Sequence, residues 1–178
     1  MDSQPVSESK PVSESSTQLA RLMSIGDANN AGNVHGGTVM KLADEAAGLA
    51  AIKHSGRRVV TAAMDRVDFL VPIAVGELVT FKAMVNAAWR TSMEVGVRVE
   101  AEDVRTGETR HANSAYFTMV ALDDNGNPTR VPSAVALTNS EQRRRREAEF
   151  RRSNRLAERA EIMATRAREE EGQGGGPG

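Results

Sequence analysis

Asp44 is a carboxylate on the apolar side of an expected helix, where such a group needs either a partner or a chemical role. Apolar residues recur at helical spacing over Gly36–Ser55. At 100° per residue, Asp44 lies on the same side of this helix as Met40 and Ala47. An unpaired buried carboxylate is costly, and partial dehydration would strengthen it as a general base. The spacing alone leaves two interpretations open: a catalytic base, or a structural Asp that pairs with an Arg or caps a turn.

The segment DANNAGNVHGG precedes this helix and supplies polar side chains and two glycines at its amino end. It contains Asn29 and His35, followed by Gly36 and Gly37. Unpaired N–H groups at a helix N-terminus bind anions or polarised carbonyl oxygens, and glycines let a ligand approach the backbone closely. With Asp44 about two turns further on, these residues predict a helix that carries both an electrophile site and a base.

After Ser55 the apolar period changes from helical to strand-like. Apolar and polar residues alternate within the following segments, and short turns separate them. We expect strands at Gln18–Ile25, Val59–Val71, Glu77–Trp89, Ser92–Val104 and Thr109–Leu122. The last segment is apolar on both faces, which is typical of a central strand. This β-α-β-β-β-β order predicts an α+β fold with one sheet face under the long helix, and the other face and the edges then require a partner subunit.

The two ends of the chain differ in composition from its middle. Residues 1–16 repeat the unit PVSES and have almost nothing to bury, so we expect a disordered tail before the folded domain at residues 17–138. Residues 139–171 are rich in Arg and Glu and predict a charged helix, followed by a disordered Gly-rich tail at residues 172–178. We interpret Arg143–Arg146 as part of this helix and not as a nucleic-acid site, because aromatic residues for stacking are nearly absent.

The composition excludes several kinds of chemistry. The chain of 178 residues has no cysteine, which excludes thiolate catalysis and disulfides, and its three histidines leave little material for a metal site. A formal net charge of -1 gives no overall attraction to nucleic acid or to an anionic membrane. No apolar run of about 18 residues and no apolar segment near the start are present. We therefore expect a cytoplasmic protein without a membrane span.

Four blocks of the sequence carry a resemblance to a known family. They are DANNAGNVHGGTVMKLADEAAG (Asp27–Gly48), VVTAAMDRVDFLVPIAVGELV (Val59–Val79), the SMEV step at Ser92, and SAYFTMVAL (Ser114–Leu122). These blocks resemble the hotdog-fold acyl-CoA thioesterases, which include the vertebrate cytosolic acyl-CoA hydrolase and bacterial YciA-type enzymes. The resemblance implies a hotdog fold, in which a five- to six-stranded antiparallel sheet wraps a long central helix, here with a C-terminal helical extension.

The resemblance also implies a catalytic pair and the hydrolysis of acyl-CoA to free fatty acid and CoA. Asn29 and Asp44 match the family's catalytic Asn and Asp, which meet across a dimer interface. Asp44 would act as general base or as nucleophile, while Asn29 from the partner protomer orients the water or the thioester. The amides of Gly36 and Gly37 would stabilise the oxyanion, and Met40 would line part of a tunnel for the acyl chain.

Further substrate contacts and self-association follow from the same resemblance. His35 lies beside the glycines, Ser92 begins the SMEV step, and Arg90 could meet the CoA phosphates. We expect acyl-CoA as the substrate, no metal or other cofactor, and a homodimer that assembles further into a trimer of dimers. We do not expect nucleic acid as a partner.

Two other functions remain open from the sequence. In a hotdog hydratase or dehydratase, His35 and Asp44 would form an acid–base pair on an enoyl-CoA, although NVHGG does not resemble the His-containing loop of those enzymes. Alternatively, the protein binds acyl-CoA without hydrolysing it and acts as a regulator through its basic tail. Release of free thiol from acyl-CoA distinguishes hydrolysis from both.

Overall fold

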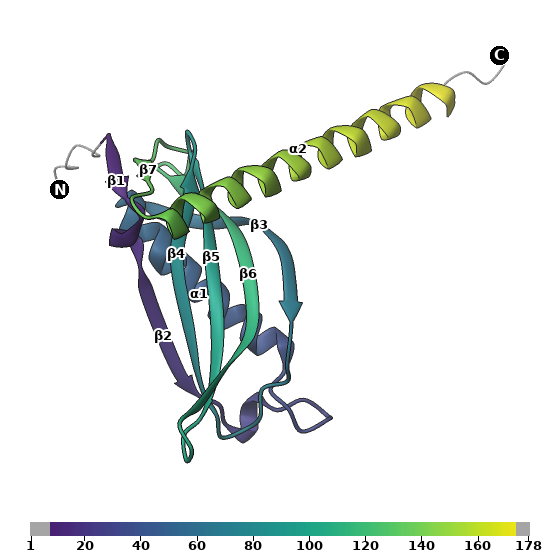
Figure 1. The fold of residues 1–178 in the computed structure, drawn as a ribbon. Helices are drawn as coiled ribbons and strands as arrows, with labels where there is room; N and C mark the ends of the chain where they lie inside the picture. Colours follow the sequence, from purple (N-terminus) through teal and green to yellow (C-terminus); the bar gives the residue numbers. More distant parts are fainter. Residues whose placement is uncertain (1–7, 174–178) are drawn as a thin grey trace.

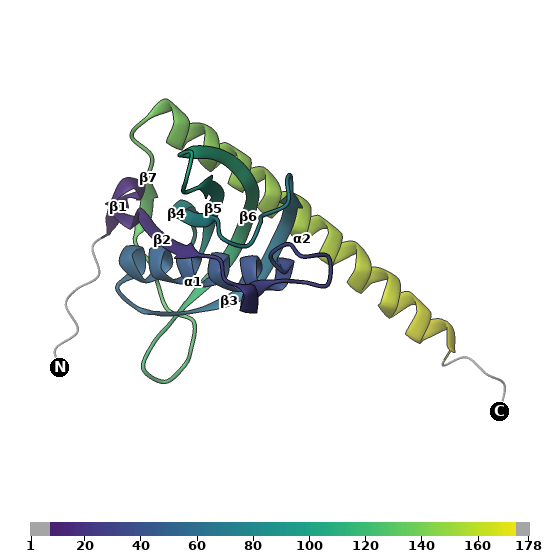
Figure 2. The ribbon, with the colours of Figure 1, turned by 90° about the horizontal axis from the view of Figure 1, so that it is seen from below.

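Five antiparallel strands form the main sheet, and a helix lies against each of its two faces (Figures 1 and 2). The computed structural model describes residues 8–173. Helix α1 (Gly36–Ser55) covers one face of the sheet, and helix α2 (Asn139–Gln173) crosses the other. The strand order is β2-β4-β5-β6-β3, with the bounds β2 Thr17–Leu22, β3 Arg58–Phe69, β4 Leu78–Ala88, β5 Ser92–Asp103 and β6 Glu108–Leu122.

The elements expected from the sequence are present. Helix α1 has the predicted bounds, and the strand ends differ from the prediction by at most three residues. Strand β6, expected in the middle of the sheet, lies between β5 and β3. An antiparallel sheet wrapped around one long helix, with a second helix at the C-terminal end, is the predicted α+β architecture.

Small residues let α1 approach the sheet closely. The side of the helix that faces the sheet is made of alanines, none more than 1% exposed: Ala43, Ala46, Ala47, Ala50 and Ala51. Alternate residues of the central strands pack against them, and these are also buried: Val79, Phe81, Val95, Val97, Val99, Phe117 and Met119. Because Ala46 is fully buried against the sheet, a larger side chain at this position would force the helix away from the sheet.

Both ends of α1 are fixed by local hydrogen bonds. His35 is the N-cap, and its Nδ1 accepts a hydrogen bond of 2.9 Å from the amide of Gly37. At the other end Gly56 takes the left-handed conformation, with φ of 64°, and its amide donates to the carbonyl of Ile52. A glycine adopts this conformation without strain, so it ends the helix where the Ser-Gly pair predicted.

The prediction of a disordered tail over residues 1–16 is wrong for the part that the structure describes. Strand β1 (Ser9–Pro11) pairs in parallel with β7 (Ser133–Val135), which the sequence did not predict, and a 3-10 helix follows at Val12–Ser15. Val12 is 1% exposed and packs into the core. The buried Ser15 hydroxyl donates to the Val12 carbonyl and accepts from the Val85 amide. The second PVSES unit therefore folds because it has one apolar residue and one hydroxyl to bury. Residues 1–7 lie outside the described residues.

Helix α2 is attached to the sheet by its first half, and its second half extends away from the domain (Figure 1). Thr138 and Glu141 form reciprocal hydrogen bonds at its start, a capping box. Further along, Arg151 pairs with Glu94 at 2.6 Å and Arg155 pairs with Asp65 at 2.5 Å. The helix thus covers the sheet face that the sequence left to a partner subunit. It continues to Gln173, beyond the predicted end at residue 171, and residues 174–178 lie outside the described part.

Candidate active site

Asp44 lies at the boundary between the buried and exposed sides of α1, and Thr61 of β3 hydrogen-bonds to one of its carboxylate oxygens. The Thr61 hydroxyl donates a hydrogen bond of 2.6 Å to Asp44 Oδ1. Within the described residues, no other group hydrogen-bonds to this carboxylate. Asp44 is half-buried between the fully buried Ala43 and the exposed Glu45. The expected position on the buried side of the helix is therefore only partly right, and Asp44 Oδ2 can meet a ligand or water.

A cavity of about 430 Å³ opens at this carboxylate. It lies between α1 and the edge of the sheet, and its lining includes Leu19, Asp44, Leu49, Ile52, Val59, Thr61 and Met119. Most of these side chains are apolar. A carboxylate with one oriented oxygen at the rim of an apolar cavity can serve as a base toward water beside an apolar substrate.

A second cavity, of about 350 Å³, lies at the amino end of α1. Asn29, Gly36 and Phe69 contribute to its lining. The side-chain oxygen of Asn29 accepts hydrogen bonds from the amides of Ala31 and Asn33, at 2.9 and 3.2 Å, and so shapes the loop. Within the described chain the Asn29 side-chain nitrogen has no hydrogen-bond partner, so this donor is available to an oxygen of a ligand.

Asp27 anchors the loop that carries Asn29. The Ser24 amide and hydroxyl and the Arg21 guanidinium all donate to the Asp27 carboxylate at 2.8–2.9 Å. The hydrogen bonds from Ser24, and then the charge of Arg21, hold the pKa of Asp27 below its usual value. The Asp27 carbonyl also accepts from the His35 amide, which ties the loop to the start of the helix. The loop is therefore a fixed part of the fold.

The oxyanion site predicted at two amides is wrong for one of them. The amide of Gly37 donates to the Nδ1 atom of His35, so it is not bare. The amide of Gly36 has no acceptor among the described residues and lies in the second cavity. One backbone donor thus remains, and it lies at the positive end of the helix dipole. His35 itself is exposed, and its cap bond gives it a structural task.

The two halves of the predicted site are too far apart to act on one carbonyl within one chain. Gly36 and Asp44 are eight residues apart on α1. At 1.5 Å per residue this places them about 12 Å apart along the helix, whereas a reacting carbonyl must lie about 3 Å from both groups. The two cavities also share no lining residue. Within a single chain, one helix therefore cannot present the base and the oxyanion amide to the same thioester, and the pairing of these groups across a dimer stays a prediction.

Other predicted substrate contacts lie elsewhere in the single chain. Met40 is 36% exposed on α1 and lines neither cavity, whereas it was expected to be buried. Arg90 lines a different cavity, with Trp89 and Arg130, and Ser92 begins β5 at the same turn. The structure does not bring these residues next to Asn29 or Asp44.

Thr61 is the residue that sequence analysis missed. It stands within the run VVTAAM, where a threonine is ordinary because β-branched residues favour strands. Its contact with Asp44 joins residues 17 positions apart on two elements. Only the placement of α1 against β3 reveals it.

The described residues contain no cluster of three or more His, Asp or Glu side chains that could hold a metal ion. Neither helix has, within the part of the chain that is described, a stretch both long and apolar enough to cross a membrane.

Comparison with known proteins shows which family has this fold. Residues 31–108 match the Thioesterase superfamily. The cytosolic acyl coenzyme A thioester hydrolase of Mus musculus is 37% identical over 152 residues, which cover 83% of this chain and 40% of the mouse protein. Among solved structures, the Staphylococcus aureus acyl-CoA hydrolase in complex with butyryl coenzyme A superposes with a TM-score of 0.81 at 39% identity, covering 88% of this chain and 95% of that one. An apo-hexameric acyl-CoA thioesterase gives 0.83 at 39% identity, covering 86% and 98%.

A helix wrapped by an antiparallel sheet, with these relatives, defines a hotdog-fold protein of the acyl-CoA thioesterase class. The chain belongs to the Thioesterase superfamily, and the predicted fold and family are confirmed. It spans 63% of the length of the Helicobacter pylori protein VdlD, to which it is 43% identical, and 40% of the mouse relative. Variants of the S. aureus enzyme in which an Asn, an Asp or a Thr is replaced by Ala are also similar to it, at 38% identity.

Proposed function

We propose that this protein hydrolyses acyl-CoA thioesters to free fatty acid and CoA at a site assembled from two copies of the chain. The observation that carries the proposal is the contact between Thr61 and Asp44. This hydrogen bond orients the carboxylate and leaves Oδ2 without a partner among the described residues, at a residue that lines a mostly apolar cavity. Such an arrangement suits a base that activates water next to an acyl chain.

The reaction needs two proton transfers: one from the attacking water to Asp44, and one from Asp44 to the leaving CoA sulfur. Asp44 Oδ2 takes a proton from water as the water oxygen attacks the thioester carbonyl, and the oxyanion forms. When the carbonyl re-forms, the C–S bond breaks and the CoA sulfur receives the proton from Asp44. Direct attack by the Asp44 carboxylate is the other route. It would break the C–S bond, release CoA thiolate and form a mixed anhydride; water would then hydrolyse the anhydride in a second step and supply the proton that the thiolate takes up. No metal or other cofactor takes part in either route.

The second half of the site comes from the partner protomer. The Asn29 side-chain nitrogen and the Gly36 amide are donors without acceptors in the described chain, and both line one cavity. Together they would hold the thioester oxygen and stabilise the developing negative charge, with help from the dipole of α1. Donors that are fixed by the fold need no rearrangement during the reaction, so their effect on the transition state is large.

The edge of the sheet explains how the halves would meet. Strand β3 is an edge strand, and apolar side chains along and after it are exposed, including Val60, Phe69 and Leu70. Phe69 packs beside Gly36, since a Cβ atom at Gly36 would lie 3.2 Å from its ring. If two copies pair along β3 about a two-fold axis, the Phe69 end of one strand lies beside the Thr61 end of the other. That brings the donors of one copy toward the base of its partner.

The relatives support both substrate and assembly. The S. aureus hydrolase was solved with butyryl coenzyme A, and a similar thioesterase is hexameric. In the S. aureus sequence the Asn, Asp and Thr replaced by Ala are spaced by 15 and then 17 residues, as are Asn29, Asp44 and Thr61 here. We therefore assign acyl-CoA as the substrate and a trimer of dimers as the assembly. A cytoplasmic location accords with the mouse relative's description as cytosolic.

Thiol release from a panel of acyl-CoAs tests the proposal. Asn29→Ala and Asp44→Asn should each lower kcat by about a hundredfold or more, because each removes a group that acts on the reacting carbonyl. Asp124→Asn is the matched control. It removes an exposed carboxylate in the turn after β6, which lines neither of the two cavities, and should leave activity unchanged. Undiminished thiol release by Asp44→Asn would refute the mechanism, and hydration of an enoyl-CoA without thiol release would favour the hydratase.

A further inference from the structure

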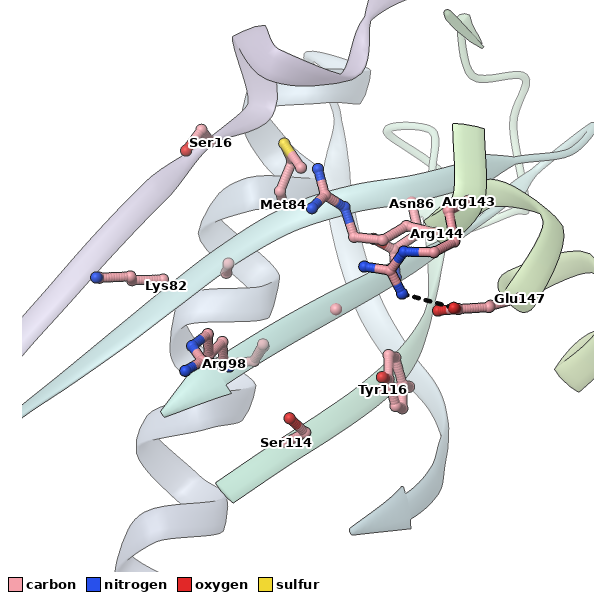
Figure 3. A pocket seen from close by; sticks show the side chains of 13 residues that line it. Ser16, Lys82, Met84, Asn86, Arg98, Ser114, Tyr116, Arg143, Arg144 and Glu147 are labelled. Atoms are coloured by element: carbon pink, nitrogen blue, oxygen red, sulfur yellow. Dashed lines mark hydrogen bonds and ion pairs between the residues drawn. The ribbon is translucent and has the colours of Figure 1, made fainter. Parts of the chain in front are cut away.

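A basic cavity lies on the outer face of the sheet, at the corner where α2 meets the strands (Figure 3). Its volume is about 350 Å³, within the range of pockets that hold small molecules. Strands β4, β5 and β6 form its floor, and the first turns of α2 form one wall. Helix α1 and the proposed active-site cavities lie on the opposite face of the sheet. The basic cavity is therefore separate from them within the chain.

Four cationic side chains from three elements gather around this cavity. They are Lys82 of β4, Arg98 of β5, and Arg143 and Arg144 of α2. Two carboxylates oppose them. Glu100 accepts from Lys82 and Arg98, at 2.6 and 2.7 Å, and Glu147 accepts from Arg143 at 2.6 Å. The cluster therefore keeps an excess of two positive charges, although the whole chain has a net charge of -1.

Arg144 is the cation of this cluster that has no ion pair within 4.0 Å among the described residues. It is half-buried, its Nε atom is buried without a hydrogen-bond acceptor, and the carboxylate of Glu141 interacts with its charge only from a longer distance. A guanidinium in this condition is unfavourable unless an anion completes its hydrogen bonds. Its planar set of donors matches two oxygens of a phosphate group, which an arginine binds in a bidentate manner.

The floor supplies neutral groups and is held in shape by buried contacts. Ser114 and Tyr116, two residues apart on the same face of β6, line the cavity and bring their hydroxyl groups to it. Asn86 donates to the buried Glu94 and lies over Gly96, where a Cβ atom would be only 2.7 Å from the Asn86 nitrogen. Glycine at 96 thus leaves room for Asn86, which keeps the floor open between the cationic side chains.

We propose that this cavity binds the phosphate or diphosphate group of a small organic molecule, with Arg144 and Arg98 as its main ligands. The anion would accept hydrogen bonds from the terminal nitrogens of Arg144, which have no acceptor among the described residues, and would bridge α2 to β5. Two sources carry this chemistry: the nucleotide part of CoA, and a separate phosphorylated metabolite. Binding does not require thioester hydrolysis, so the proposal stands apart from the proposed reaction.

Titration calorimetry on the full chain at low salt tests the site, with inorganic pyrophosphate and adenosine 3′,5′-bisphosphate as probes. We expect saturable binding of one probe per chain, weakened at least about tenfold by Arg144→Gln, because a charge-assisted bidentate contact is lost. Arg98→Gln, on a different element, should weaken binding similarly. Arg145→Gln is the matched control: it is adjacent to Arg144, pairs with Glu149, does not line the cavity, and should change affinity less than about twofold. Glu147→Gln removes an opposing carboxylate and should tighten binding.

Several results would overturn the proposal. One is the absence of saturable binding of both probes to the wild type. Another is equal weakening by Arg144→Gln and Arg145→Gln, which would mean general charge attraction. A third is that neither probe binds, while Arg144→Gln or Arg98→Gln changes the molecular mass measured by light scattering. That result would show that the cavity is an interface between copies of the chain. Where binding holds, displacement of pyrophosphate by CoA identifies the substrate's nucleotide part as the source, and the lack of displacement identifies a separate metabolite.

Discussion

Mixing two inactive variants should restore activity if the site combines Asn29 of one protomer with Asp44 of its partner. In this experiment, Asn29→Ala and Asp44→Ala chains carry different tags and are co-expressed in equal amounts. Each variant alone should retain about one hundredth of wild-type activity or less, since each site lacks one catalytic group. A mixed dimer has one site with both defects and one site with neither.

The expected recovery follows from the arrangement of the two cavities. Within one chain, Gly36 and Asp44 are about 12 Å apart along α1, so each complete site must draw on two chains. Random assortment makes half of the dimers mixed, and each mixed dimer has one intact site of two. Activity per chain should therefore be about one quarter of the wild type, well above the background of either variant. A further assembly into hexamers does not change this fraction.

The assay is thiol release from a saturating acyl-CoA, with the tags used to verify the mixed species. Wild type mixed with the double variant provides the control. It also gives about one quarter of full activity when sites are shared between chains, and about one half when each chain has a complete site. Background activity in the first mixture, together with one half in the second, would refute the shared site.

Other outcomes follow from single contacts. Thr61→Val removes the hydrogen bond to Asp44, so kcat should fall about tenfold or more while the melting temperature stays the same; an unchanged kcat in the thiol-release assay would deny Thr61 its orienting role. Glu94→Leu leaves Arg151 without its buried partner, and denaturant unfolding should show a loss of about 3 kcal/mol; a variant as stable as the wild type would contradict this. The pKa of Glu77 lies below its usual 4.5, mainly because Arg110 hydrogen-bonds to the carboxylate. This pair stabilises the fold above pH 4.5 and the contribution is lost as the pH falls below it, so Glu77→Gln should show a shallower acid decline in unfolding free energy, and an identical decline would exclude the pair as its source.

The local elements were predictable because each is encoded by the period of its own residues. The helix at Gly36–Ser55 and the five strands of the main sheet follow from helical spacing and from alternation. The loop block with Asn29 and the helix block with Asp44 gave the family, which the comparisons confirm. The second PVSES unit was the local failure, because its composition predicts disorder and only the docking of Val12 and Ser15 orders it.

The sequence by itself therefore determined which segments become helix or strand and which two side chains to suspect. The tertiary structure alone decided what surrounds them. It brought Thr61 to Asp44, gave the Gly37 amide to His35, and gathered Arg144 and Arg98 around one cavity. The physical reason is that hydrogen-bond reach is about 3 Å, whereas these partners come from elements whose distance depends on strand order and helix docking. No local period along the chain carries that information.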